Sequence, residues 1–357
     1  MVVMSLETDE IAAMVRKSGT KSMVFAYDGT RRSHLIQEVS KTEGPDSEKL
    51  SIDWNDYSKN AFKKMLEISV LMFAHGLQEI TYPMWFPTLG KRGKEYTPKF
   101  ISYMWGLNTL YSDPYLREKY EADGIRIIFY GEWRELCRLG EDPELERLLE
   151  KIQEDSKHRT KNVLLFGTNI SSPATVMANL AIDHYKKYNK TPTREEMIMD
   201  YYGYPLSDVD MYVGFDRFVT DGRPPIISEN GNENLYFTVS PHSFFNISVL
   251  RSILFDHLFN RTVANTKEYD LTRLDIKSMH SFYSKNEKTA LGVGNIQLKG
   301  NFCNSNNSNN SNNSDNSNQN HSINNNKCTF KLNSSNNNHH SPNQLTINIP
   351  VFIVASF

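Results

Sequence analysis

The residues whose types and spacing suggest chemistry stand together near the start of the chain. Asp28 is followed by Gly29 and Thr30, and then by two arginines, Arg31 and Arg32. Guanidinium groups recognise phosphate oxygens through planar forks of N–H donors. A neighbouring carboxylate suits a Mg²⁺ ion that bridges to the same phosphates. The pattern therefore predicts a diphosphate-binding site, with Asp28 as the metal ligand and the other four residues around the anion.

The position of these side chains supports this interpretation. A short apolar run, residues 22–27, precedes them and has the character of a strand. In open α/β sheets, ligands bind outside the carboxyl ends of the strands. A helix that begins here adds free N–H donors for an anion. A surface turn that carries an Asp–Arg pair, nearly neutral in energy, explains the same five residues, and the pattern alone leaves both interpretations open.

Alternating segments of strand and helix character follow as far as about residue 261. Strand character is found at residues 22–27, 78–85, 125–130, 162–168, 209–215 and 235–239. Helical spacing or helix-start signals are found at residues 53–76, 98–111, 114–120, 142–154, 172–188, 193–202 and 243–261. This alternation predicts an α/β fold, with a central, mostly parallel sheet flanked by helices on both faces.

Some boundaries of these helices carry recognisable signals. Asp53 is a candidate cap for the long helix, and Gly76 stands where that helix has to stop. Thr193 and Glu196 have the spacing of a capping box, which predicts a helix start at this point.

The composition of the 357-residue chain changes abruptly near residue 301. We expect an N-terminal segment at residues 1–20 and a single catalytic domain at residues 21–300. Residues 301–344 are rich in Asn and Ser and are predicted to be disordered, because such a tract buries too little apolar surface to offset its ordering entropy. The apolar residues 345–357 suit an edge strand, a hydrophobic anchor or an artefact of gene prediction equally well.

Bulk properties narrow the class of protein. The formal net charge is −2, so there is no basic excess to neutralise the phosphates of a nucleic acid, and we expect no nucleic-acid partner. The three cysteines, Cys137, Cys303 and Cys328, form no CxxC pair and fit a reducing compartment. The sequence shows no secretory signal and no apolar stretch long enough for a transmembrane segment. A cytoplasmic location is therefore expected.

More of the chain resembles one family. An Asp-Gly pair with a following arginine, after the first strand, resembles the diphosphate-binding motif of the cis-prenyltransferase (undecaprenyl diphosphate synthase-like) fold. The form found at residues 28–32 is closer to the tuberculosinyl adenosine transferase (tuberculosinol, or diterpene, synthase) family. Further similar segments are residues 73–76, 128–131, 192–196, 201–203, 210–218, 235–241 and 250–257. The resemblance covers roughly residues 23–261 in order, which is more specific than any single motif.

The resemblance implies roles for particular residues. Asp28 matches the aspartate that such enzymes use for Mg²⁺ and for diphosphate ionisation, and Arg31 and Arg32 match the arginines that hold the diphosphate. Tyr57, at the start of the long helix, matches a tyrosine near the same group, although a core or rim tyrosine fits this position too.

The resemblance also implies an activity. The expected enzyme ionises an allylic prenyl diphosphate of the C20 class and passes the cation to water, as a terpene alcohol synthase, or to a nucleoside such as adenosine, as a prenyl transferase. The implied cofactor is Mg²⁺, and the implied assembly is a homodimer.

The chain departs from the elongating cis-prenyltransferases at several points. Their late Arg-Thr-Gly-Gly-Glu run is replaced by residues 212–217, and their Phe-Ser-x-Glu-Asn-Trp motif is replaced by residues 82–86. We therefore do not expect a second diphosphate pocket or chain elongation; Arg217 alone suits either a ligand contact or a surface position. A short-chain cis-prenyl diphosphate synthase and a non-catalytic prenyltransferase-like scaffold subunit remain as alternatives.

A prenyl chain needs a long apolar pocket. The candidates for its lining are Met72, Phe73, Trp85, Phe86, Met104 and Trp105. Large apolar residues at helical spacing suit an ordinary core equally well. His75 and His257 both fall on predicted helices, and we expect structural roles for them.

Overall fold

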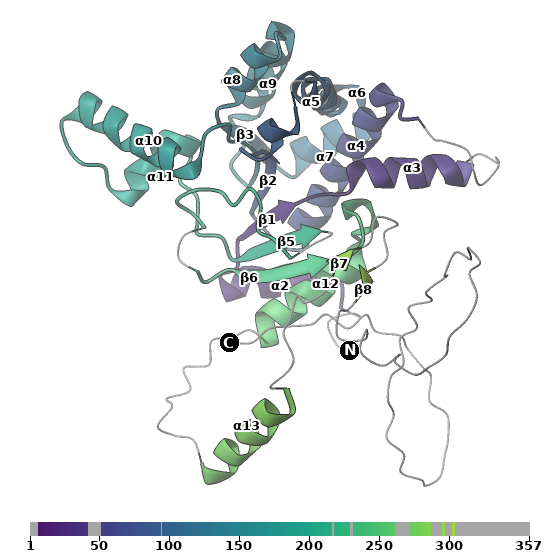
Figure 1. Cartoon of the computed structure of the whole chain (residues 1–357), viewed down its shortest axis with the longest axis vertical. Helices are drawn as coiled ribbons and strands as arrows, with labels where there is room; N and C mark the ends of the chain where they lie inside the picture. Colours follow the sequence, from purple (N-terminus) through teal and green to yellow (C-terminus); the bar gives the residue numbers. More distant parts are fainter. Residues whose placement is uncertain are drawn as a thin grey trace, which may run out of the picture. The chain divides into compact units, whose positions relative to one another are not determined.

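Six strands in the described part of the chain form one parallel sheet in this computed structural model (Figure 1). They are β1 (Ser22–Ala26), β2 (Glu79–Trp85), β3 (Ile125–Gly131), β4 (Asn162–Thr168), β5 (Met211–Phe215) and β6 (Asn234–Thr238). Their order across the sheet is β3-β4-β2-β1-β5-β6, and each neighbouring pair is parallel. The predicted α/β class with a central parallel sheet is confirmed.

The structure describes residues 6–41, 51–93, 95–215, 218–228, 231–260, 272–286, 295–296 and 302–303. Two units divide the chain, Met1–Ala264 and Asn265–Phe357, and the first contains the whole six-stranded sheet. In the second unit the described elements are α13 (Arg273–Asn286) and the short antiparallel pair β7 (Asn295–Ile296) and β8 (Phe302–Cys303). Apart from β8, the Asn-rich tract and the apolar segment at residues 345–357 lie outside the described residues.

Helices of the first unit flank the sheet (Figure 1). They are α2 (Thr8–Ser18), α3 (Thr30–Lys41), α4 (Trp54–Ala74), α5 (Tyr96–Met104), α6 (Thr109–Ser112), α7 (Pro114–Ala122), α8 (Trp133–Leu139), α9 (Pro143–Ser156), α10 (Pro173–Tyr188), α11 (Arg194–Tyr202) and α12 (Ile247–Phe255). Short 3₁₀ turns are η1 (Leu89–Arg92), η2 (Trp105–Asn108) and η3 (His242–Phe244), and a π turn, η4 (Asp256–Asn260), continues α12.

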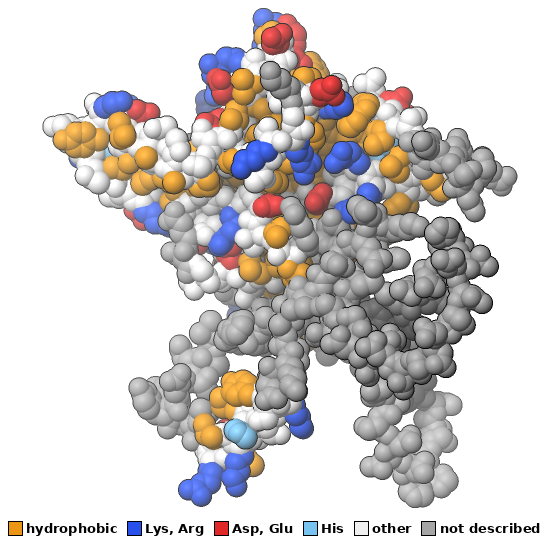
Figure 2. Space-filling model, in the orientation of Figure 1, with side chains coloured by type: hydrophobic (Ala, Val, Ile, Leu, Met, Phe, Trp, Pro, Cys, Tyr) orange, Lys and Arg blue, Asp and Glu red, His pale blue; other side chains and the backbone are white. Residues whose placement is uncertain are grey.

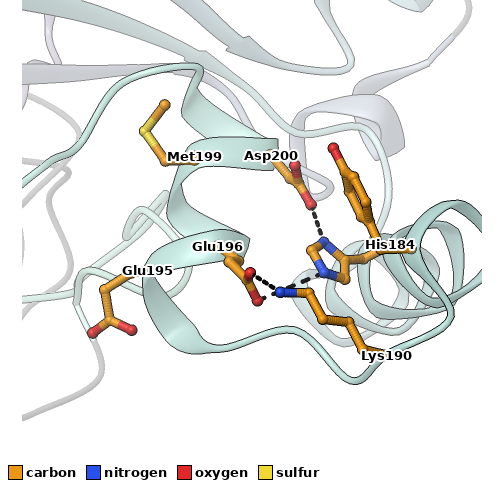
Figure 3. A pocket seen from close by; sticks show the side chains of 7 residues that line it. His184, Lys190, Glu195, Glu196, Met199 and Asp200 are labelled. Atoms are coloured by element: carbon orange, nitrogen blue, oxygen red, sulfur yellow. Dashed lines mark hydrogen bonds and ion pairs between the residues drawn. The ribbon is translucent and has the colours of Figure 1, made fainter.

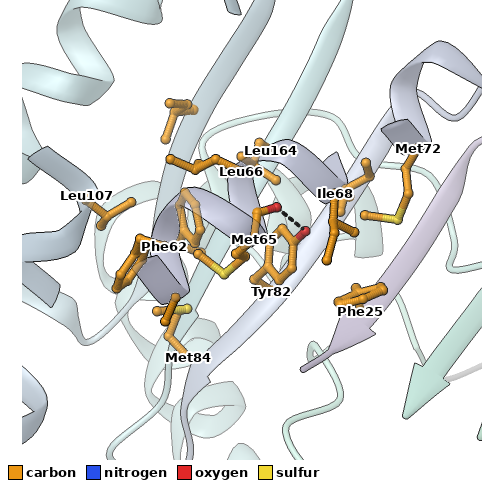
Figure 4. Packing of buried hydrophobic residues seen from close by; sticks show 14 of the residues in the cluster. Phe25, Phe62, Met65, Leu66, Ile68, Met72, Tyr82, Met84, Leu107 and Leu164 are labelled. Atoms are coloured by element: carbon orange, nitrogen blue, oxygen red, sulfur yellow. Dashed lines mark hydrogen bonds between the residues drawn. The ribbon is translucent and has the colours of Figure 1, made fainter. Parts of the chain in front are cut away.

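Both faces of the sheet are buried in apolar clusters. The larger cluster joins Phe25 and Tyr82 of neighbouring strands to Phe62 and Met65 of α4 (Figure 4). Val24, which alternates with Phe25 along β1, belongs instead to the smaller cluster on the opposite face. Burial on both faces explains why these strands read as continuous apolar runs in the sequence.

The helix signals of the sequence act as predicted. The Asp53 side chain accepts hydrogen bonds from the backbone N–H groups of Asn55 and Asp56, which caps α4. Thr193 and Glu196 form the reciprocal contacts of a capping box at the start of α11.

The predicted single helix at residues 98–111 is wrong, because the chain there is divided into α5, η2 and α6. Gly106, in η2, lies close against α4: a Cβ at this position would be 2.6 Å from the backbone oxygen of Ser58 and 2.4 Å from Cδ2 of Phe62. The Ser58 hydroxyl also donates a hydrogen bond to the Tyr103 carbonyl at 2.9 Å. This close approach accompanies the local change to the tighter 3₁₀ form.

The helix α2 was not predicted, although it contributes to the core. Ile11 and Val15 are buried in the larger cluster, and a Cβ at Gly76 would lie 2.7 Å from the Ala12 carbonyl oxygen. The N-terminal helix therefore packs directly against the end of α4. The division into residues 1–20 and 21–300 stays a prediction.

Candidate active site

The Asp28–Gly29 turn joins the end of β1 to the start of α3. Gly29 has φ +74°, a left-handed conformation that glycine adopts at low cost. The Asp28 carboxylate accepts a hydrogen bond from the Gly29 N–H at 2.5 Å, and the Gly29 carbonyl accepts the first hydrogen bond of α3 from Ser33 at 2.9 Å. The turn therefore places an acidic side chain directly before a helix N-terminus.

This turn lies where the topology of the sheet favours ligand binding. From β1 the chain proceeds to β2 on one side, whereas β5 pairs with β1 on the other side. Such a reversal of strand order leaves a crevice at the carboxyl ends of the strands, and ligands of open α/β proteins bind in this crevice. Arg217, which follows β5, lies outside the described residues.

Arg31 and Arg32 occupy the first turn of α3. Both side chains are exposed, as is Asp28, and the first turn of the helix contains no acidic residue. The Arg32 side chain reaches back over the turn, with Nη2 3.2 Å from the position that a Cβ at Gly29 would take. Two guanidinium groups and the positive end of a helix dipole thus gather at one place, an arrangement that favours a bound anion.

Tyr57, which the resemblance places near the diphosphate, reaches this turn from α4. Its hydroxyl is hydrogen-bonded to the Thr30 hydroxyl at 2.5 Å, and only 5% of the residue is exposed. Burial raises the pKa of Tyr57 to about 12, although the Thr30 hydrogen bond and the charge of Arg31 act in the opposite direction. The hydroxyl consequently stays protonated at neutral pH and is able to donate a hydrogen bond.

The structure thus brings Tyr57 into contact with Thr30, beside the other residues that the sequence singled out. Asp28, Gly29, Thr30 and the two arginines follow one another along the turn and the first turn of α3. Their roles in binding or catalysis stay predictions.

Sequence reasoning missed a second segment at this turn, residues 241–243. The backbone N–H and the ring Nδ1 of His242 both lie 3.2 Å from the Asp28 carbonyl oxygen. The Ser243 hydroxyl donates a hydrogen bond to the Ser33 hydroxyl at 2.7 Å. No spacing signal identifies these residues in the sequence, because the contact depends on the path of the chain after β6.

His34 is another residue that sequence reasoning missed. It lies on α3, is 5% exposed, and its ring centroid is 5.6 Å from that of Tyr57. Its Nδ1 is buried and has no hydrogen-bond partner. Trp54 and Tyr103 pack against Tyr57 as well, with ring centroids at 5.6 Å and 5.3 Å. The ring of Tyr57 is therefore packed among other aromatic rings, while its hydroxyl is bonded to Thr30.

The candidate lining of a prenyl pocket is divided between core and surface. The buried residues Met72, Phe73, Trp85 and Met104 belong to the larger apolar cluster, and Phe86 packs against it. Trp105 is 38% exposed, and its indole N–H donates to the Asp142 carboxylate at 2.7 Å. Trp105 therefore lies at the surface, and the buried residues serve as core in the structure.

The two histidines expected to be structural are in structural positions. The His75 ring is hydrogen-bonded through Nδ1 to the Leu71 carbonyl at 2.8 Å, and Arg251 donates to its Nε2 at 3.3 Å. The His257 ring bridges Thr20 and Asn234, at 3.0 Å and 2.7 Å.

A cavity of about 390 Å³ lies elsewhere in this unit, between α10 and α11 (Figure 3). His184 stands there between Asp200, 2.6 Å from Nδ1, and Glu196, 3.6 Å from Nε2. Glu196 also pairs with Lys190 and accepts from the Thr193 N–H that begins α11. These contacts join the two helices to each other. Figure 1 shows this pair projecting from the sheet on the side away from α3, so the cavity is separate from the turn after β1.

The donor atoms at the turn fit a Mg²⁺ ion that takes only one ligand from the protein. Within the described ranges, no group of three or more His, Cys, Asp and Glu side chains could hold a metal ion. Asp28 provides one exposed carboxylate. Mg²⁺ in phosphate-handling sites is commonly held by one or two carboxylates, water and the phosphate oxygens themselves. The residues present therefore fit an ion that arrives with a diphosphate.

The visible surface of the sheet-containing unit carries charges of both signs (Figure 2). Figure 2 shows acidic and basic side chains interspersed over the visible part of the sheet-containing unit.

In the described part of the chain, no helix is long and apolar enough to cross a membrane.

The structure defines an open parallel α/β protein, with one carboxylate and two arginines on the turn at the topological switch point of its sheet. Comparison with protein-family models gives no match. Among curated proteins, the chain is similar to tuberculosinyl adenosine transferase of Mycobacterium tuberculosis (strain CDC 1551 / Oshkosh). The two are 27% identical over 286 residues, which cover 80% of this chain and 91% of the relative. The resemblance to this family that the sequence motifs indicate is thereby confirmed.

Two solved structures are also similar in fold. One is a probable undecaprenyl diphosphate synthase from Campylobacter jejuni, with a TM-score of 0.46 and 13% identity over 67% of this chain and 94% of that one. The other is lavandulyl diphosphate synthase from Lavandula x intermedia in complex with dimethylallyl diphosphate, with a TM-score of 0.46 and 10% identity over 68% of this chain and 97% of that one.

Proposed function

We propose that the chain is an enzyme that ionises an allylic diphosphate of the C20 class and passes the cation to water or to a nucleoside such as adenosine. The observation that carries the proposal is the turn after β1, where the Asp28 carboxylate, the two arginines of α3 and the Thr30–Tyr57 hydroxyl pair come together. The curated relative is named for the transfer of a tuberculosinyl group to adenosine, which supports the choice of substrate and acceptor.

In the proposed reaction the bond between the allylic carbon and the diphosphate oxygen breaks, and its electron pair leaves with the diphosphate. Negative charge grows on the leaving group as the bond breaks. Arg31 and Arg32 donate hydrogen bonds to this charge, and the N-terminus of α3 adds the positive end of its dipole. Because the leaving group carries more negative charge in the transition state than in the substrate, these donors stabilise the transition state more than the substrate.

Tyr57 adds a neutral donor to this charged set. Because the pKa of Tyr57 is raised to about 12, the hydroxyl keeps its proton throughout the physiological range. It is able to donate to a diphosphate oxygen, either directly or through the Thr30 hydroxyl. Removal of one such donor typically lowers kcat by about 10²- to 10³-fold.

The Asp28 carboxylate is the proposed ligand for Mg²⁺. When bound there together with the substrate, the ion supplies positive charge for the leaving diphosphate. Asp28 would hold the ion at the start of α3, on the same turn as the arginines.

The allylic cation is then captured by a nucleophile. Attack by water forms a carbon–oxygen bond and releases a proton, which gives a terpene alcohol. A nucleoside nitrogen uses its lone pair to form a carbon–nitrogen bond, and the prenylated nucleoside carries the positive charge until an N–H proton is released. Both outcomes use the same ionisation step, so the proposal includes both acceptors.

The experiment that tests the proposal incubates the purified protein and Mg²⁺ with geranylgeranyl diphosphate and with a bicyclic diterpenyl diphosphate, with and without adenosine. Mass spectrometry identifies the alcohol or the prenylated nucleoside. We expect release of diphosphate by the wild type and loss of this activity in Asp28→Ala. Asp183→Ala, at an exposed position on α10, is the control and retains activity.

Three results would contradict the proposal. Equal activity of wild type and Asp28→Ala would remove the turn from the mechanism. Incorporation of radiolabelled isopentenyl diphosphate would instead favour the elongating synthase. A protein inactive with every allylic diphosphate would favour a scaffold subunit.

We also propose the homodimer that the resemblance implies. Static light scattering of the purified protein measures its mass in solution. Twice the mass of the 41.2-kDa chain is the expected result, and the mass of a single chain would contradict it.

A further inference from the structure

His242 lies directly against the Asp28–Gly29 turn. The residue is 1% exposed and begins η3, the short turn that follows β6. Two of its atoms, the backbone N and the ring Nδ1, are 3.2 Å from the same acceptor, the carbonyl oxygen of Asp28. One residue therefore directs two donors at the peptide group that follows the proposed catalytic carboxylate.

The hydrogen-bond partner determines the state of the ring. A carbonyl oxygen only accepts hydrogen bonds, so Nδ1 carries the hydrogen and, in the neutral ring, Nε2 carries the lone pair. Nε2 is buried and has no hydrogen-bond partner. Protonation of Nε2 would place an unpaired charge in the interior, which is strongly unfavourable. The structure is thus consistent only with a neutral ring that donates through Nδ1.

The electrostatics agree with this assignment. Burial lowers the pKa of His242 to about 4, and the positive charge of Lys64 acts in the same direction, whereas the hydrogen bond to Asp28 opposes both. The ring also packs against Tyr27, with centroids 5.4 Å apart.

The neighbours of His242 hold the same turn at two further points. A Cβ placed on Gly29 would lie 2.9 Å from Cβ of Pro241, so the proline packs closely on the glycine. The Ser243 hydroxyl donates to the Ser33 hydroxyl in the first turn of α3. Residues 241–243 therefore contact the turn before, at and after its left-handed glycine.

We propose that His242 is a positioning residue that fixes the Asp28 peptide, and with it the direction of the Asp28 carboxylate and the N-terminus of α3. Its effect on catalysis rests on the proposed function, whereas its effect on the turn does not. A histidine that merely filled the core would act through its volume, and the identity of the nitrogen that donates would have no importance.

Two amide substitutions separate these roles. In His242→Asn the side-chain amide takes the place of Nδ1, so that a donor to the Asp28 carbonyl is retained. In His242→Gln the longer side chain carries its amide to the region of Nε2, and the Asp28 carbonyl keeps only the backbone donor. Thermal unfolding of both variants establishes that each is folded.

The first measurement is amide hydrogen exchange of the peptide that covers residues 28–33. We expect exchange about fivefold faster in His242→Gln than in the wild type, and within about twofold of the wild type in His242→Asn, since loss of one hydrogen bond is worth about 1 kcal/mol. This measurement needs no substrate. Equal exchange in the two variants would overturn the proposal.

The second measurement is binding of inorganic pyrophosphate in the presence of Mg²⁺, followed by steady-state kinetics on the allylic diphosphate. We expect His242→Gln to reduce kcat on the order of tenfold or more with a smaller change in KM, because misalignment acts mainly on the transition state. His242→Asn restores most of kcat. A change confined to KM, or failure of Asn to restore kcat, would contradict the positioning role.

The two measurements distinguish failure of the proposed function from failure of the positioning role. If the wild type neither binds pyrophosphate nor releases it, the proposed function is wrong, and hydrogen exchange still decides whether His242 fixes the turn. If the wild type is active and both variants match it in kcat and in exchange, the proposed function stands and His242 has no positioning role.

Discussion

Neighbouring groups at the candidate active site have opposite environments. Asp28, Arg31 and Arg32 are exposed at the surface of the protein. Tyr57 and His242 are buried and neutral, and each directs a hydrogen-bonding group at the turn from the protein side. In the proposed function the charged residues meet the anion, and the buried residues support the turn that carries them.

Substitution of Tyr57 tests the hydroxyl alone. We expect Tyr57→Phe to lower kcat by about 10²-fold, because it removes one donor and keeps the ring that packs against Tyr103. Release of diphosphate from the allylic substrate is the measurement. Tyr120→Phe is the matched control, since it removes a buried hydroxyl bonded to Ser69. Comparable activity of the two variants would mean that Tyr57 is only a core residue.

Substitution of Gly29 tests the shape of the turn. We expect Gly29→Ala to lower the free energy of unfolding by more than the roughly 1–2 kcal/mol of a left-handed non-glycine residue, because the new Cβ also meets Pro241 at 2.9 Å. Gly203→Ala is the control, with φ +66° and no atom within 4 Å of its Cβ. Urea unfolding measures both. Equal losses would show that the contact with Pro241 is unimportant.

Between elements, one arginine joins three segments that are far apart in the sequence. From α12, Arg251 donates to the Leu6 carbonyl at 2.9 Å, to the Thr8 hydroxyl at 3.1 Å and to the His75 ring at 3.3 Å. These contacts fix the start of α2 and the end of α4 to the last helix of the unit.

Loss of this arginine is predicted to weaken the fold. We expect Arg251→Met to reduce the free energy of unfolding by about 1–3 kcal/mol, because it removes three partly buried hydrogen bonds while it keeps most of the side-chain volume. Arg147→Met, which breaks an exposed pair with Glu144, should change it by no more than about 1 kcal/mol. Denaturant titration compares them, and a similar small effect of both would contradict the prediction.

A pH dependence is expected at the start of β2. Burial raises the pKa of the Glu79 carboxyl, even though the group accepts hydrogen bonds from the N–H and the hydroxyl of Ser207 at 2.9 Å and 3.2 Å. The folded state therefore binds the proton more tightly than the unfolded state. The contribution of this group to stability is fully present below the unfolded pKa and is lost as the pH rises through the raised folded pKa.

Glu79→Gln removes this titration and retains an acceptor for Ser207. We expect the stability of the variant relative to the wild type to increase as the pH rises from about 4.5, the usual pKa of the group, towards neutrality. Urea unfolding at a series of pH values gives the difference. A constant difference across the series would mean that Glu79 ionises normally in the folded protein.

For the whole molecule, the sequence patterns predicted the sheet well. Residues 162–168 were predicted as a strand and form β4 with these bounds, because a strand buried on both faces needs an unbroken apolar run. Capping chemistry located α11 for a similar reason, since Thr193 and Glu196 satisfy backbone groups that lie beside them in the chain. Structural features that depend on neighbouring residues in the chain are therefore visible in short stretches of sequence.

Features that depend on distant contacts were not predicted. The helix break at Gly106 depends on its closeness to α4, and the role of His242 depends on the path of the chain from β6 back to the end of β1. Neither relation is present in any short window of sequence. Asp28, the two arginines and Tyr57 were therefore singled out in the sequence, whereas His242, which supports the turn from beyond β6, was not.

A shortened chain tests the division of the molecule. The unit Met1–Ala264 contains the six-stranded sheet and the whole candidate site. We expect a chain ended after Ala264 to unfold cooperatively and to keep the activity of the full chain within about threefold, since neighbouring domains fold on their own cores. Circular dichroism and the diphosphate-release assay measure this. Loss of the cooperative transition would show that the second unit is needed for folding.

The contact between His242 and Asp28 joins residues 214 positions apart, and it has a consequence for protein synthesis. A growing polypeptide displays its aspartate and arginines to the cell long before translation reaches β6. Until that strand leaves the ribosome, the turn lacks its support from Pro241 and His242. We therefore expect ribosome-bound chains that end at β5 to lack the proposed activity, which begins only after Pro241 and His242 have left the ribosome and reached the turn.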